Sequence, residues 1–238
     1  MNKKYLPAFL PVRSVIFLLI FVLGSVMTGR DIDHISNCWS IAATLVNVGT
    51  VLLLVFLARK CGFNYRELIN YQKGKTRAKQ VIIVTAVVLL MGMGGMFLAG
   101  FLCYGVIPYL APMMIAPIPV VLAVINIPLL PVTTALAEDG LYLGCGVDKI
   151  KNKYAAILIP AFFFALQHSF IPTIFEARYI MYRFLSFLPL TIWLCWYYHK
   201  ERDPLPIMIG HSVIDVATVM QIFATSAIPG FYDKMCGN

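Results

Sequence analysis

Seven long apolar segments, separated by short polar loops, constrain this chain more than any other feature. They cover about residues 12–29, 38–58, 81–106, 119–143, 154–171, 183–198 and 205–227. A helix of about 20 apolar residues spans the hydrocarbon core of a bilayer. Because the chain has 238 residues, these segments leave no room for a second, soluble domain. We therefore predict an all-α polytopic membrane bundle of about seven transmembrane helices, with a single integral membrane domain over residues 1–238.

The composition supports a membrane protein and argues against a nucleic-acid-binding one. The chain is 60% hydrophobic and only 13% charged, whereas soluble domains carry about 25% charged residues. The formal net charge is +8, but the basic residues fall in or beside the short loops. That distribution sets the orientation of a membrane protein and does not indicate nucleic-acid binding.

The distribution of Lys and Arg predicts a cytoplasmic N-terminus. In that orientation, 15 of the 19 basic residues lie on the inner side, Arg13 among them, and the outer side keeps Arg30, Arg178, Arg183 and Lys234. We expect the protein in a bacterial cell membrane, because the short chain shows no appended domains.

Glycines and prolines mark two of the apolar segments. The third segment carries Gly92, Gly95 and other small residues, which allow helices to approach closely in lipid. The fourth segment contains Pro128 and Pro131, which remove helical hydrogen bonds and predict a kink. We interpret the glycines as packing residues and not as a phosphate-binding loop.

Five ionisable residues lie inside the apolar segments or at their ends: Glu138, Asp139, His168, His211 and Asp215. An ionisable side chain within a bilayer costs several kcal/mol and is normally functional. Carboxylates and histidines together can activate a water molecule and stabilise an oxyanion. We therefore predict the active site of an intramembrane hydrolase.

Helical spacing predicts how these residues face one another. Glu138 and Asp139 are adjacent and point about 100° apart on an α-helix, so we expect one to face a cavity and the other to be held by neighbours. His211 and Asp215 are four residues apart and share a face, so the carboxylate can accept a hydrogen bond from the imidazole. The structural alternatives are a solvated helix end for the acid pair, a packing role for His168 and a buried His–Asp pair.

Together the three clusters resemble the CPBP family of CAAX proteases and bacteriocin-processing enzymes, also called the abortive-infection family. Its pattern is E-E-x-x-x-R, then F-x-x-x-H, then H-x-x-x-N or H-x-x-x-D. The matching residues are Glu138-Asp139, Phe164 with His168, and His211 with Asp215, within a core of about residues 119–225. The resemblance implies a fold similar to that of the type II CAAX prenyl endopeptidase, an all-helical intramembrane protease.

The resemblance also implies a function and a role for each residue. The chain would be a glutamate-type endopeptidase that needs no cofactor and cleaves membrane-associated or prenylated peptides at the lipid bilayer. Glu138 would be the general base, His168 would position the water, and His211 and Asp215 would stabilise the oxyanion. Because an ionised carboxylate cannot donate a hydrogen bond, we expect Asp215 to orient His211, which would be the donor.

Two departures from the pattern keep other functions open. Asp139 replaces the second glutamate, and Leu143 occupies the arginine position, which leaves Asp139 without its expected partner. The missing arginine favours a non-catalytic bacteriocin-immunity or membrane scaffold protein of the same fold. A metalloprotease-like alternative makes Glu138, His168 and His211 a zinc set, although the chain has no H-E-x-x-H motif. A transporter with a proton relay is a further alternative.

Overall fold

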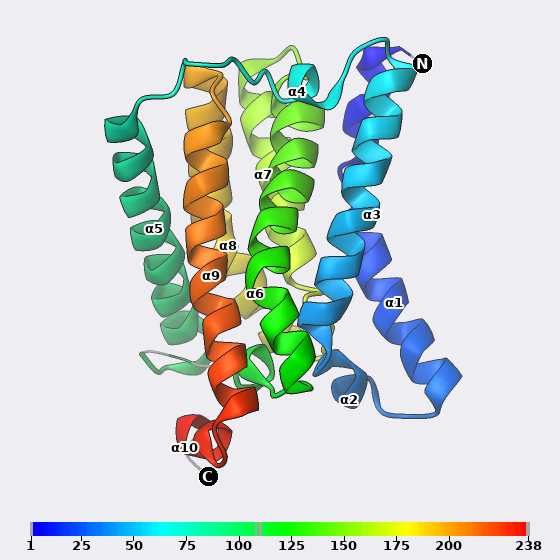
Figure 1. Cartoon of the computed structure of the whole chain (residues 1–238), viewed down its shortest axis with the longest axis vertical. Coiled ribbons are helices and arrows are strands. Elements are labelled where there is room, and N and C mark those ends of the chain that lie inside the picture. The colour runs from blue at the N-terminus through cyan, green and yellow to red at the C-terminus, as the bar shows by residue number, and fades with distance from the viewer. Residues whose placement is uncertain (1, 108, 110, 237–238) are drawn as a thin grey trace.

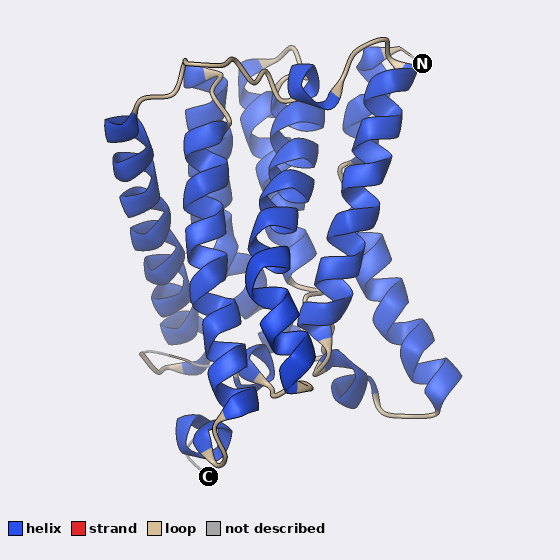
Figure 2. Ribbon diagram, viewed as in Figure 1, coloured by secondary structure: helices blue, strands red, loops and turns tan. Residues whose placement is uncertain are grey.

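The computed structural model describes residues 2–107, 109 and 111–236, and these residues form a bundle of helices (Figure 1). No strand lies among the described residues, and Figure 2 shows helices joined by short loops. The predicted all-α class is therefore confirmed. The helices are η1 (Lys3–Phe9), α1 (Val12–Thr28), α2 (Ile32–Ser36), α3 (Trp39–Lys60), α4 (Tyr65–Leu68), α5 (Ala78–Tyr104), η2 (Pro112–Ile115), α6 (Val120–Thr134), η3 (Ala135–Val147), α7 (Lys153–His168), α8 (Ala177–Glu201), α9 (Leu205–Ala227) and α10 (Phe231–Cys236).

Six helical stretches of the described chain are long and apolar enough to cross a membrane. They are Lys3–Thr28, Trp39–Lys60, Ala78–Tyr104, Val120–Val147, Ala177–Glu201 and Leu205–Ala227. The remaining predicted span, about residues 154–171, is present as α7, which has 16 residues and ends at His168. At 1.5 Å per residue, α7 is about 24 Å long, shorter than the roughly 30 Å hydrocarbon core.

Local sequence signals explain where several helices begin and end. The Asn152 side chain accepts hydrogen bonds from the first backbone N–H groups of α7. Asn64 and Glu67 form a reciprocal capping box around α4. Gly29 and Gly105 end α1 and α5 with φ values of 64° and 73°, a backbone conformation that glycine adopts at little cost.

Small residues let the central helices approach one another, as the sequence predicted. Helix α8 packs against α5 and α7, and α9 packs against α5 and α6. A Cβ atom built on Gly95 of α5 would lie 2.3 Å from the Ser186 carbonyl oxygen of α8, and one on Gly92 would lie 2.5 Å from the Ile214 side chain. These glycines therefore serve helix packing.

The loops separate into two groups at opposite ends of the bundle (Figure 1). The N-terminus, α4 and the turn between α8 and α9 lie at one end, and α2, α10 and the C-terminal end lie at the other. Two basic residues that we assigned to the ends are instead buried inside the bundle: Arg13 is 1% exposed and Arg183 is 2% exposed. Without them, the predicted distribution of basic residues becomes 14 on one side and three on the other.

The predicted fourth span begins as the α-helix α6 and continues without a break as the π-helix η3. Its wider turn is shown by the hydrogen bond from the Asp148 amide to the Leu143 carbonyl, five residues earlier. Tyr65 of α4 donates a hydrogen bond to the Leu136 carbonyl of η3 at 2.5 Å. A Cβ atom on Gly140 would meet the Tyr65 hydroxyl at 2.6 Å, so only glycine leaves room for this contact. π-Helical turns are rare and often occur at functional sites.

Candidate active site

Glu138 lies at the centre of the site, and its two carboxylate oxygens have different surroundings. The residue is 3% exposed and belongs to η3. Oε1 accepts a hydrogen bond from Arg13 Nη2 at 2.8 Å. Oε2 has no hydrogen-bond partner among the described residues, and it lies 3.8 Å from Nε2 of His168 and 3.8 Å from Nε2 of His211. The free oxygen therefore faces both histidines.

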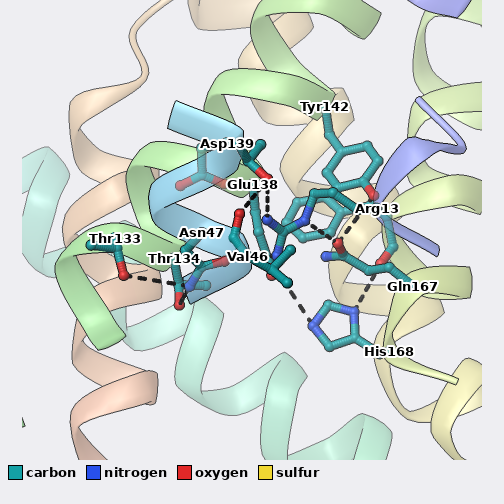
Figure 3. Close-up of polar contacts among 12 residues, drawn as sticks. Arg13, Val46, Asn47, Thr133, Thr134, Glu138, Asp139, Tyr142, Gln167 and His168 are labelled. Carbon is teal, nitrogen blue, oxygen red and sulfur yellow. Dashed lines mark hydrogen bonds and ion pairs between the residues drawn. The ribbon is translucent and has the colours of Figure 1, made fainter. Parts of the chain in front are cut away.

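Arg13 of α1 fixes the other oxygen, as Figure 3 shows. Its guanidinium donates to the side-chain oxygens of Gln167 at 2.6 Å, Thr50 at 3.0 Å and Asn47 at 2.8 Å, besides Glu138. Gln167 Oε1 also accepts a hydrogen bond from the Tyr142 hydroxyl at 3.1 Å. Four helices, α1, α3, η3 and α7, thus hold the Glu138 carboxylate in one orientation.

His168 is the last residue of α7, and two contacts set the direction of its ring. Nδ1 lies 2.8 Å from the Phe164 carbonyl, which can only accept, so this nitrogen carries the proton. The ring stacks on Phe187 with centroids 3.6 Å apart and an interplanar angle of 13°. Nε2 is therefore the nitrogen that points toward Glu138.

His211 of α9 is held by the second acid of the motif. Its Nδ1 lies 3.3 Å from Asp139 Oδ1, and its Nε2 lies 3.8 Å from Glu138 Oε2. Glu138 lines a cavity and Asp139, 1% exposed, is held by His211, which is the arrangement expected for side chains about 100° apart. Both acids nevertheless reach the same imidazole. The π-helical turn of η3 brings successive side chains closer together than an α-helix does.

Among the described residues Asp215 forms no hydrogen bond with His211, and Asp139 instead lies 3.3 Å from the His211 Nδ1. Its role in orienting His211 therefore stays a prediction. Asp215 lies one turn further along α9, half-buried, and its Oδ2 is buried without a hydrogen-bond partner in the part of the chain that the structure describes. It lines the cavities beside His211 and is not part of the hydrogen-bonded pair.

Two adjoining cavities meet at the histidines. The smaller has a volume of about 70 Å³ and is lined by Asn47, Thr134 and Glu138 on one side. The larger, of about 110 Å³, extends between α5, α8 and α9, with Met96, Leu190 and Ile214 in its walls. Seven residues line both spaces, and four of them are ionisable: His168, Arg183, His211 and Asp215. The site thus has a polar part around Glu138 and an apolar extension.

The alternative zinc set of Glu138, His168 and His211 is brought together in space. Zinc with bonds of about 2.1 Å in a tetrahedral site holds its ligand atoms about 3.4 Å apart, and the measured separations are 3.8 Å. Each histidine also donates its other ring nitrogen to an oxygen, as zinc-binding histidines do. Within residues 2–107, 109 and 111–236, no group of three or more His, Cys, Asp or Glu residues meets the geometry of a metal site.

Sequence reasoning missed the polar residues that support the acid pair: Arg13, Asn47, Thr50 and Gln167. Arg13 was assigned to the cytoplasmic loop because it stands at the edge of an apolar segment. Asn47 and Thr50 stand within the second apolar segment, three residues apart, so they share a helical face. That polar pair inside a span was the available signal.

Comparison with known proteins finds one family model that matches part of the chain. Residues 120–217 match the family model described as "Type II CAAX prenyl endopeptidase Rce1-like". The match covers less than half of the chain. It lies inside the predicted core of about residues 119–225 and contains all five predicted site residues. No curated protein matches the chain, and no solved structure does.

The match to this family model is consistent with the resemblance drawn from the three motifs. It supports an intramembrane protease of the CAAX type at the level of the family. The family model does not cover every residue of this hydrogen-bond network. Arg13, Asn47 and Thr50 precede the matched residues, whereas Glu138 and Gln167 lie within them.

Proposed function

We propose that this chain is a glutamate-type intramembrane endopeptidase in which Glu138 activates a water molecule. The observation that carries the proposal is the position of Glu138 Oε2. Within the part of the chain that the structure describes, this oxygen has no hydrogen-bond partner, and it lies 3.8 Å from each histidine Nε2 atom. A water molecule between the three atoms can form hydrogen bonds of ordinary length with all of them.

The surrounding contacts suit a general base. Arg13 fixes Oε1, so the carboxylate cannot rotate away from the histidines. The attacking water would give its proton to Oε2, and its oxygen would add to the scissile carbonyl. His168, with its proton on Nδ1, would accept a hydrogen bond at Nε2 and position the water.

His211 is the group best placed to stabilise the oxyanion. Asp139 accepts from its Nδ1–H and favours the charged imidazolium, whose Nε2–H can donate to the developing negative charge. The protonated Glu138 would then return the proton to the leaving amine, which completes hydrolysis without a covalent intermediate. Asp215, at the wall of both cavities, would contact the substrate and not the water.

The substrate would be a membrane-associated or prenylated peptide. The larger cavity is bounded mostly by apolar side chains and lies between helices that are long enough to cross a membrane. An apolar or lipid-modified chain segment enters such a space from the bilayer at little desolvation cost.

The test is hydrolysis in water enriched in oxygen-18. Purified protein in lipid nanodiscs is incubated with pools of S-farnesylated and unmodified peptides, and products are identified by mass spectrometry. The proposal predicts cleavage products with one oxygen-18 atom in the new carboxylate. Glu138→Gln should abolish them, and Glu201→Gln, at the exposed end of α8, should not. Equal product from wild type and Glu138→Gln would contradict the proposal, and absence of product in every pool would favour the non-catalytic immunity or scaffold alternative.

A further inference from the structure

Both cavities of the candidate site extend toward the end of the bundle that holds α2, η2 and α10 (Figure 1). The wall of the smaller cavity includes Trp39, the first residue of α3, Met114 of η2 and Ile171, which follows α7. Met114 also lines the larger cavity, together with the exposed Gln221 of α9. Gln221 lies six residues before Ala227, the last residue of α9, or about 9 Å along the helix axis. The cavities therefore run from the acid pair to this end of the bundle.

The opposite direction, toward the N-terminal end of the bundle, is closed by packed side chains. Leu6 of η1, Leu68 of α4 and Leu143 of η3 are all 0% exposed and belong to one apolar cluster. Tyr65 of α4 also donates a hydrogen bond to the backbone of η3. In the part of the chain that the structure describes, no residue of η1, α4 or the loops at that end lines either cavity. Apolar packing therefore separates Glu138 from the N-terminal end.

This difference between the two ends matters because hydrolysis consumes water. A carboxylate inside a membrane bundle is tolerated where it lines a cavity that water can fill. The attacking water and the polar chain of a peptide must both reach Glu138 from an aqueous surface. Since the N-terminal end is closed and the cavities run the other way, both enter from the end near Met114 and Gln221.

The distribution of basic residues indicates which face of the membrane this end meets. Fourteen Lys and Arg residues lie in the loops and helix ends at the N-terminal end of the bundle. The other end carries three: Arg30, Arg178 and Lys234. Short loops rich in Lys and Arg remain on the cytoplasmic side of a membrane. The end toward which the cavities run then faces the outer side.

We propose that the site takes its substrate from the outer face of the membrane, and that this substrate is an exported peptide anchored in the outer leaflet. The proposal rests on the proposed function for the reaction, and it narrows the class of peptide. A lipid-modified peptide on the cytoplasmic face meets the closed end of the bundle. An anchor in the outer leaflet lies beside the apolar larger cavity, and the peptide chain that it carries reaches the histidines from the same side.

The experiment measures from which face of the membrane a charged reagent reaches single cysteines in the full-length protein. The buried Cys145 and Cys195 stay in place, and each of the other four cysteines is replaced by serine unless it is the reporter. Cys38 and Cys61 flank α3 at its two ends, so each reports the orientation of one end of the bundle. The reagent is a trimethylammonium methanethiosulfonate, which does not cross membranes and reacts with thiolates in water.

Two further reporters test access to the site. Thr218→Cys lies in the wall of both cavities, and Ile214→Cys lies in the wall of the larger one, one turn nearer His211. The second reporter covers a failure of the first to fold, which size-exclusion chromatography detects. Ala217→Cys is the matched control, because Ala217 is exposed on the same helix and lines neither cavity. Rates are compared in spheroplasts, which present the outer face, and in inside-out vesicles, which present the cytoplasmic face.

The proposal predicts that Cys38 reacts at least tenfold faster in spheroplasts than in inside-out vesicles, and that Cys61 does the reverse. Thr218→Cys and Ile214→Cys should follow Cys38. Ala217→Cys should react slowly in both preparations, because its thiol faces lipid.

A second measurement uses peptides with an N-terminal palmitoyl chain and a charged sequence, which insert into the membrane face to which they are added. Cleavage by the wild type that is lost in Glu138→Gln should occur in spheroplasts and not in inside-out vesicles. This arm tests the side of the substrate, whereas the labelling arm tests access without any cleavage.

Reaction of Thr218→Cys and Ile214→Cys from the same side as Cys61, or from neither side, would overturn the proposal. Reaction of Cys38 in inside-out vesicles alone would overturn the assignment to the outer face. Access from the outer face in a protein that cleaves no peptide would sustain this inference and reject the proposed function. Cleavage that depends on Glu138 and is confined to inside-out vesicles would do the opposite.

Discussion

Arg13 and Glu138 form a buried ion pair, with Nη2 and Oε1 2.8 Å apart, between α1 and the π-helix η3. The family pattern places an arginine at the position of Leu143, and here the arginine that contacts the acid motif comes from the first helix instead. Its partner is Glu138, whereas Asp139 pairs with His211. The departure at Leu143 therefore does not leave the acid pair without partners.

The ion pair should dominate the stability of the site. Arg13→Gln removes one partner and leaves the Glu138 charge buried, which should lower the free energy of unfolding by about 3–5 kcal/mol. The double variant Arg13→Gln with Glu138→Gln removes both charges and should recover most of that loss. Unfolding by denaturant in detergent micelles measures both. Equal stability of the single and double variants would show that the two charges are not coupled.

Leu143→Arg tests whether the family position itself matters. Leu143 is fully buried in the apolar core, so an arginine there places a charge in the core of the bundle. We expect a loss of stability of roughly 3 kcal/mol and no gain in peptidase activity. Leu143→Met, which changes shape but not charge, should cost under about 1.5 kcal/mol. A more active Leu143→Arg protein would show that Arg13 does not supply the missing function.

The two carboxylates near His211 should differ in importance. Asp139 Oδ1 lies 3.3 Å from the imidazole Nδ1, whereas Asp215 forms no hydrogen bond with the ring among the described residues. Asp139→Asn should lower kcat by about 100-fold or more, because His211 loses the group that holds its Nδ1–H and its charge. Asp215→Asn should cost less and should raise KM more than it lowers kcat. Steady-state kinetics on one peptide show which variant loses more activity. A greater loss of kcat in Asp215→Asn than in Asp139→Asn would favour the role of orienting His211 that the sequence predicted for Asp215.

Gly140 should be intolerant of any side chain. A Cβ atom there would lie 2.6 Å from the Tyr65 hydroxyl and 2.9 Å from the Leu54 side chain. Gly140→Ala should therefore lower stability by about 1–3 kcal/mol through overpacking. Gly94 of α5, whose Cβ would meet nothing within 4 Å, provides the control. Gly94→Ala should be neutral or should raise stability by about 1 kcal/mol, because alanine has a higher helix propensity than glycine. If Gly140→Ala leaves stability unchanged, α4 does not pack tightly on η3.

The sequence predicted the helical bundle and the five clustered ionisable residues, because long apolar runs and ionisable residues within them are strong local signals. It could not predict how those residues pair. The π-helical turn at residues 135–147 has no periodicity that distinguishes it from an α-helix, so Glu138 and Asp139 were expected to diverge. The contact of His168 Nε2 with Glu138, at 3.8 Å, joins the end of α7 to η3, and no local pattern reveals such a contact between helices.

Arg13 and Arg183 were misplaced for a related reason. Each stands at the edge of an apolar run, where a basic residue normally lies in the headgroup region. Their burial depends on acceptors from other helices: Glu138 and Gln167 for Arg13, and the His168 carbonyl for Arg183. Such partners lie more than ten residues away in the sequence, so no local pattern reveals them.

The central claim is that Glu138 acts as the base without a metal. The most direct test compares the wild type with one variant, each in the presence and absence of a chelator. Initial rates of peptide cleavage are measured for wild type and Glu138→Gln, each before and after treatment with a strong zinc chelator. The account predicts a loss of at least about 1,000-fold in kcat for Glu138→Gln and an unchanged wild-type rate after chelation. A wild-type rate that falls with chelation and returns when zinc is added would contradict it, and would assign Glu138, His168 and His211 to a zinc site.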